Sequence, residues 1–137
     1  MNVRTKKAKG RRLQKRVVEL ILKYFPELSE DDVRSVPSSV PGSDIQLSAY
    51  AKQLIPFSIE CKNQERINLY KFWEQAKVNG MKERLEPLLV VKSNFREELA
   101  VLRLEYLIKL ISEVKDGKRK IRGNNKRGGG KVGKEEL

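Results

Sequence analysis

Three charged side chains in the first half of the sequence have types and a spacing suited to hydrolytic chemistry. Asp44 follows a Pro-Gly-Ser turn, and Glu60 and Lys62 stand two residues apart in the segment FSIECK. Side chains alternate along a strand, so Glu60 and Lys62 share one face, opposite the core-forming Phe57, Ile59 and Cys61. A hairpin between residues 44–48 and 56–62 would bring the two carboxylates together.

Two carboxylates and the backbone carbonyl of Cys61, which lies between Glu60 and Lys62, form a set of hard oxygen ligands suited to Mg²⁺ or Mn²⁺. Such a metal polarises a phosphate and lowers the pKa of a bound water, and a lysine beside it orients that water or stabilises the developing charge. The pattern therefore predicts phosphodiester hydrolysis. The competing interpretation is a solvent-facing strand side on which Glu60 is ion-paired with Lys62 or another neighbour.

The composition excludes several other kinds of chemistry. The sequence has no histidine and one cysteine, which removes His-activated nucleophiles, most zinc sites and an internal disulfide framework. No apolar run reaches the roughly 18 residues of a membrane helix, and the start of the chain lacks the apolar block of a signal peptide. We expect a soluble protein that is not in a membrane and acts in the cytoplasm, or in the host cytoplasm if a phage encodes it.

The net charge of +12 is concentrated at the two ends of the chain. Residues 1–16 carry eight Lys or Arg and no acid, residues 115–137 carry nine against three acids, and the middle is close to neutral. Basic ends on a near-neutral body predict a polyanionic partner, most simply nucleic acid, with an anionic membrane surface as the competitor. The predicted nucleic-acid-binding residues are Lys6, Lys7, Lys9, Arg11, Arg12, Lys118, Arg119, Lys120, Arg122, Lys126 and Arg127.

Periodicity and turn residues predict an α/β fold, a small mixed β-sheet flanked by helices. Residues 1–9 read as a basic disordered arm, and residues 116–137 as a basic, Gly-rich disordered tail. Between them we expect helices at 10–25, 68–80 and 105–115, with Pro26 and Gly80 as stops for the first two. The expected strands are 33–36, 44–48, 56–62, 87–93 and 99–104.

The segments PGSD and FSIECKNQ resemble motifs II and III of the PD-(D/E)xK nuclease superfamily, whose members include archaeal Holliday-junction resolvases and small phage-encoded endonucleases. The resemblance implies a restriction-endonuclease-like core and makes residues 10–115 a nuclease-like domain. It also implies that Asp44, Glu60 and the carbonyl of Cys61 bind the metal and that Lys62 is catalytic. Pro41 stands three residues before Asp44 rather than directly before it.

Relatives often carry a Glu on the first helix, one turn after a glycine, and the corresponding residue here is Gln14. Glu19 is the alternative, but at about 100° per residue it falls on the polar face, where it can pair with Lys23. Gln75 resembles a glutamine that relatives carry after motif III. A serine that resolvases place before their aspartate corresponds to one of three residues, Ser35, Ser38 or Ser39.

The sequence therefore predicts a Mg²⁺- or Mn²⁺-dependent DNA endonuclease, with branched DNA such as Holliday junctions as a candidate substrate. Cutting both strands of a junction needs two active sites, and apolar residues on the helices at 68–80 and 105–115 would permit a homodimer. The alternative is a non-catalytic basic nucleic-acid-binding protein whose acidic residues are structural.

Overall fold

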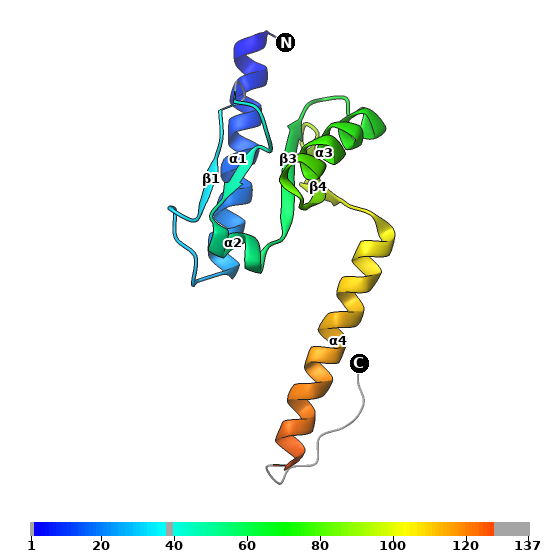
Figure 1. Cartoon of the computed structure of the whole chain (residues 1–137). Helices are drawn as coiled ribbons and strands as arrows, with labels where there is room; N and C mark the ends of the chain where they lie inside the picture. Colours follow the sequence, from blue (N-terminus) through cyan, green and yellow to red (C-terminus); the bar gives the residue numbers. More distant parts are fainter. Residues whose placement is uncertain (1, 38–39, 128–137) are drawn as a thin grey trace. The chain divides into compact units, whose positions relative to one another are not determined.

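The computed structural model describes residues 2–37 and 40–127 (Figure 1). The chain divides into two compact units, Met1–Val101 and Leu102–Leu137. The first unit holds three helices and five strands among its described residues, so the mixed α/β class is confirmed. In the second unit the described residues form one helix, α4 (Leu104–Arg127).

The first helix, α1, spans Val3–Tyr24 and so begins well before Gly10. Asn2 caps it by accepting a hydrogen bond from the Thr5 N–H at 2.8 Å. Residues 3–9 contain no Gly or Pro that would interrupt a helix. They are helical in the structure, so the predicted disordered arm is wrong for these residues. The helix ends at Tyr24, with Phe25 as its C-cap directly before Pro26, so it stops at the proline as the sequence predicted.

The strands form two small sheets. Strands β1 (Val33–Ser35) and β2 (Ile45–Leu47) pair antiparallel. Strand β3 (Phe57–Asn63) runs parallel to β4 (Glu86–Lys92), which pairs antiparallel with β5 (Leu99–Val101), giving the order β3-β4-β5.

The predicted hairpin of residues 44–48 with 56–62 is wrong, because β2 pairs with β1 and β3 pairs with β4. The connection between β2 and β3 is a short helix, α2 (Ala49–Leu54). Ser48 caps this helix by accepting from the Ala51 N–H at 3.0 Å. A helix in this place removes the tight turn that a hairpin requires.

Helices cover both faces of the sheet that contains β3 (Figure 1). On one face, Leu13 and Val17 of α1 belong to the same apolar cluster as Ile59, Cys61 and Val90. On the other, Phe72 and Ala76 of helix α3 (Leu69–Glu83) pack with Leu89 and Val91 of β4. The second face of β3, which carries Ser58, Glu60 and Lys62, is therefore directed toward α3.

The predicted stop at Gly80 is wrong, because α3 continues to Glu83 and ends at Arg84, whose φ of 57° is left-handed. Gly80 is instead buried at the contact between α3 and the start of β4. A Cβ at this position would lie 2.8 Å from the carbonyl oxygen of Leu85 and 3.3 Å from Pro87. Glycine therefore allows the helix to approach the strand closely.

Helix α4 extends beyond the element that the sequence predicted at 105–115. Strand β5 ends at Val101, so Leu104 starts the helix rather than ending the strand. The helix continues to Arg127 and thereby differs from the predicted disordered tail over residues 116–127, whereas 128–137 lie outside the described residues. Among the described helices, none combines the length and the apolar content needed to cross a membrane.

Candidate active site

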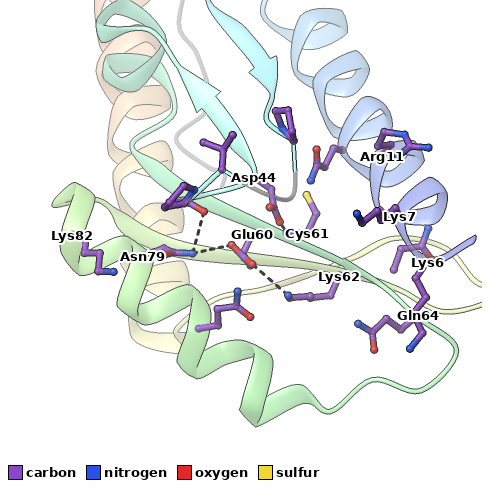
Figure 2. A pocket seen from close by; sticks show the side chains of 18 residues that line it. Lys6, Lys7, Arg11, Asp44, Glu60, Cys61, Lys62, Gln64, Asn79 and Lys82 are labelled. Atoms are coloured by element: carbon purple, nitrogen blue, oxygen red, sulfur yellow. Dashed lines mark hydrogen bonds and ion pairs between the residues drawn. The ribbon is translucent and has the colours of Figure 1, made fainter. Parts of the chain in front are cut away.

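A pocket of about 720 Å³ collects the side chains that the sequence singled out (Figure 2). Its walls come from α1, from the loop that precedes β2, from β3 and from α3. The five predicted catalytic residues all line this pocket: Gln14, Asp44, Glu60, Lys62 and Gln75. The structure thus brings the predicted site together without the predicted hairpin.

Asp44 is held against the outer edge of β3. Its backbone N–H donates to the carbonyl of Ile59 at 3.0 Å. Its Oδ2 accepts a hydrogen bond from the backbone N–H of Cys61 at 2.7 Å. Strand β3 lies at the edge of its sheet, so among the described residues the Ile59 carbonyl and the Cys61 N–H have no neighbouring strand on that side. These two backbone groups form hydrogen bonds with Asp44.

Glu60 is buried, with 3% of its surface exposed. Its Oε1 accepts a hydrogen bond from Asn79 Nδ2 at 3.0 Å, and its Oε2 lies 3.6 Å from Lys62 Nζ (Figure 2). The ion pair with Lys62 that the competing interpretation expected is present. The same interpretation expected this face of β3 to point into solvent, but α3 covers it.

The pKa of Glu60 is raised to about 7, first by burial and then by the neighbouring charge of Asp44, while Lys62 and Asn79 oppose the rise. The pKa of Asp44 is also raised by burial, against the lowering effects of the Cys61 N–H and of Lys62. Burial raises the pKa of the Cys61 thiol as well, and both carboxylates reinforce this. The pocket thus holds two carboxylates whose negative charge is only partly compensated.

Lys62 is held between an anion and an aromatic ring. Its Nζ lies 3.6 Å from Glu60 Oε2 and 5.2 Å from the centre of the Phe72 ring. Phe72 is buried, as expected for a core residue, so it offers a fixed ring face to the ammonium group. These contacts direct the amine toward the carboxylates and restrict its rotamers.

The first helix presents Gln14 to the pocket and not Glu19. Gln14 has 6% of its surface exposed and lines the pocket, whereas Glu19 is exposed on α1 and is not among the lining residues. The structure therefore places Gln14 at the pocket and Glu19 away from it. Gln75 also lines the pocket, from an exposed position on α3.

Helix α3 supplies polar residues that the sequence reasoning missed. Asn79 donates to Glu60 and, at 3.5 Å, to the carbonyl of Gly42 in the loop before Asp44. One turn further on, Glu83 accepts hydrogen bonds from the hydroxyl groups of Ser43, at 3.0 Å, and of Ser58, at 2.5 Å. Together these bonds join the loop that carries Asp44 to the strand that carries Glu60.

A signal for these residues was present in the sequence. Gln75, Asn79 and Glu83 recur at intervals of four, which places them on one face of a helix. Asn79 lies within the same stripe as the buried Phe72 and Ala76. Polar side chains inside an apolar stripe require polar partners, and the acid and hydroxyl groups of β3 are those partners.

The donor set fits a hard divalent cation. A buried carboxylate, Glu60, and a partly buried one, Asp44, both have raised pKa values and lie near the cation Lys62, so an added positive charge would offset their repulsion. The described residues contain no group of three or more His, Cys, Asp or Glu side chains placed to hold a metal ion. A metal here would therefore rely on Asp44, Glu60 and neutral oxygens such as the Cys61 carbonyl and the Gln14 amide.

Cations surround the pocket on two sides (Figure 2). Lys6, Lys7 and Arg11 of α1 line it, together with Lys82 of α3, which the sequence reasoning did not select. Lys9 and Arg12 line a different cavity beside α1. The six predicted binding residues from Lys118 to Arg127 lie on α4, and their side chains lie outside the described part of the chain.

The serine alternatives are resolved only in part. Ser35 pairs with Ile45 in the small sheet and is not among the residues that line the pocket. Ser38 and Ser39 lie outside the described residues.

Comparisons with protein-family models, with curated proteins and with solved structures give no match to this chain.

Proposed function

We propose that this protein is a metal-dependent DNA endonuclease that hydrolyses phosphodiester bonds, with an active site of the PD-(D/E)xK type. One observation carries the proposal: Glu60 is 3% exposed and still shares a pocket with a second carboxylate, Asp44, and with Lys62. Burying like charges costs stability, so a fold that needs only a core would place apolar residues there. Perturbed carboxylates in a cleft are typical of functional sites.

The proposed ligands of Mg²⁺ or Mn²⁺ are Asp44, Glu60 and the carbonyl of Cys61. Gln14 lines the same pocket and would contribute through its amide oxygen or a water. When bound, such an ion supplies Lewis-acid stabilisation of the phosphate and lowers the pKa of a coordinated water. The carboxylates are already held in place for this role, because the Cys61 N–H fixes Asp44 and Asn79 fixes Glu60.

Lys62 is the catalytic cation of the proposal. Glu60 and the Phe72 ring hold its amine beside the carboxylates, where it can orient the attacking water or donate to the phosphate oxygens as negative charge develops. Lys6, Lys7, Arg11 and Lys82 line the same pocket and would bind the flanking phosphates of the DNA backbone.

The substrate is proposed to be DNA, with branched DNA as the finer expectation. Resolution of a four-way junction needs two cuts and hence two copies of the site. Helix α3 exposes Tyr70, Val78 and Met81, and these apolar side chains offer a surface for the homodimer that this activity requires. Sedimentation of the purified chain, alone and with a junction, measures the number of copies.

The central test is a nicking assay with supercoiled plasmid and with a four-way junction in Mg²⁺ and Mn²⁺. We expect Lys62→Ala and Asp44→Ala each to lose cleavage by about 100-fold or more while still binding DNA. Glu19→Gln is the matched control, because it removes a carboxylate of α1 that lies outside the pocket. This variant should cleave as the wild type does.

The alternative function is non-catalytic binding of nucleic acid, which the cations on both sides of the pocket also support. The same assay separates the two functions. If the wild-type protein binds DNA but cleaves none of these substrates in either metal, the nuclease proposal is wrong and the alternative takes its place.

A further inference from the structure

A second cavity, of about 590 Å³, lies beside α1 and takes no part in the proposed cleavage. It is lined by four cations, Lys9, Arg12, Arg16 and Lys92, and by Phe95. Asn63, at the end of β3, lines both this cavity and the catalytic pocket. Its amide donates to the carbonyl of Lys9 at 2.9 Å, so the two sites adjoin where α1 meets β3.

Phe95 has no packing role that would explain its position. It lies in the loop between β4 and β5, and its side chain is fully exposed, at 103% of the reference surface. Its φ of 61° lies in the left-handed region, which a bulky side chain adopts only at an energetic cost. No burial of the ring offsets this cost, and strained residues of this kind concentrate at functional sites.

The charges around Phe95 favour an anionic ligand. Of the four lining cations, Arg16 is paired with Glu98 at 3.6 Å, and Lys9 donates to the neutral amide oxygen of Asn94. Glu98 is the one acid among the lining residues, so positive charge remains in excess. An exposed aromatic ring among cations is the arrangement that binds single-stranded nucleic acid, with the bases stacked and the phosphates neutralised.

We propose that Phe95 stacks on an unpaired base of the DNA, while the cations beside it hold the adjoining phosphates. This inference rests on the proposed function, because it assumes that the DNA backbone also crosses the catalytic pocket. In a continuous duplex each base is covered by its neighbours on both faces, so the ring selects a base that has left the stack. The cavity thus favours DNA with a fork, flap or single-stranded arm over fully paired DNA.

The test measures binding in EDTA, so that cleavage cannot affect the result. A forked duplex with single-stranded arms and a fully paired duplex of equal length are titrated with the wild type, Phe95→Leu and Phe95→Trp. We expect Phe95→Leu to bind the fork about tenfold more weakly and the paired duplex almost unchanged. Phe95→Trp, which keeps a stacking surface, should bind the fork at least as well as the wild type.

A 2-aminopurine base in the arm provides a direct readout of stacking. The wild type should quench its fluorescence, and Phe95→Leu should lose most of the quenching. Tyr50→Leu is the matched control, because Tyr50 is an exposed aromatic residue of α2 that is not among the lining residues of either cavity, and it should change neither binding nor quenching.

The inference would be overturned if the wild type and Phe95→Leu bound the fork with equal affinity. It would also be overturned if Phe95→Leu lost the same factor in affinity for the fork and for the paired duplex. Neither outcome depends on cleavage, which the Lys62→Ala comparison tests separately. A wild type that binds the fork through Phe95 but cuts nothing would overturn the nuclease proposal and keep this one.

Discussion

Glu60 is an acidic side chain that the protein places where water cannot solvate its charge. It is covered by α3, bonded to Asn79 and paired with Lys62, and yet its pKa is raised to about 7. The attraction of one lysine therefore does not compensate for burial and for the repulsion of Asp44. In the folded chain without metal, this carboxylate is destabilising when ionised.

The pH dependence of stability follows from this residue. The folded pKa of Glu60, about 7, lies above its ordinary value of 4.5, so between these pH values the folded state holds a proton that the unfolded state has released. The free energy of unfolding should fall as the pH rises through this window, by on the order of 3 kcal/mol, and then level off. Urea denaturation in EDTA at several pH values measures it.

Glu60→Gln provides the matched variant, since it keeps the shape of the side chain and removes the charge. Its stability should vary less between pH 4.5 and 7, and at pH 8 it should exceed that of the wild type in EDTA. Adding Mn²⁺ at pH 8 should stabilise the wild type and leave Glu60→Gln nearly unchanged. If the free energy of unfolding of the wild type rose through this pH window, Glu60 would not be a carboxylate that destabilises the metal-free fold when ionised.

At the scale of elements, the position of α3 against β3 and β4 creates the pocket. The helix must come close enough for Asn79 to reach Glu60 and for Glu83 to reach the Ser43 and Ser58 hydroxyl groups. Gly80 permits this approach, because any Cβ there would meet the backbone of Leu85 at 2.8 Å. Helix packing and site geometry are therefore set by the same contact.

Gly80→Ala should destabilise the protein by about 1–3 kcal/mol, because the added methyl group meets backbone that cannot move aside cheaply. Gly10→Ala is the matched control on another helix, where nothing lies within 4 Å of the added Cβ. It should stabilise the protein by roughly 0.5–1 kcal/mol through its higher helix propensity. Thermal and urea denaturation of both variants measure the effects; stabilisation by Gly80→Ala would refute the close-packing role.

At the scale of the whole molecule, the excess positive charge is divided between α1 and the end of the chain. Six basic residues of α1 line the two cavities: Lys6, Lys7 and Arg11 line one, and Lys9, Arg12 and Arg16 line the other. The cations from Lys118 onward belong to the second compact unit. Both groups are proposed to contact phosphates.

The salt dependence of DNA binding measures each group. Deleting residues 117–137 should weaken binding and flatten its dependence on salt, because each phosphate contact adds roughly 0.9 to the slope of log affinity against log salt. The triple variant Lys6→Gln, Lys7→Gln, Arg11→Gln should reduce the slope by roughly 2–3. An unchanged slope after the deletion would exclude the C-terminal cations as main contacts, whatever the triple variant shows.

The sequence by itself singled out the charged residues of the candidate site and the kind of chemistry that their types suit. The absence of histidine, the spacing of Glu60 and Lys62, and the turn before Asp44 required only residue types and the alternation of a strand. The buried positions of Leu13, Ile59 and Phe72 followed from periodicity in the same way. These features are local, so a local pattern is sufficient to read them.

Only the tertiary structure decided how the two carboxylates meet. The pairing of β2 with β1, the attachment of Asp44 to the edge of β3, and the burial of Glu60 beneath α3 all join segments that are distant in the sequence. Asn79, Glu83 and Phe95 gain their roles from those contacts or from a single loop conformation. Hydrogen bonding and burial depend on which surfaces meet in space, and the spacing of residues along the chain does not specify that.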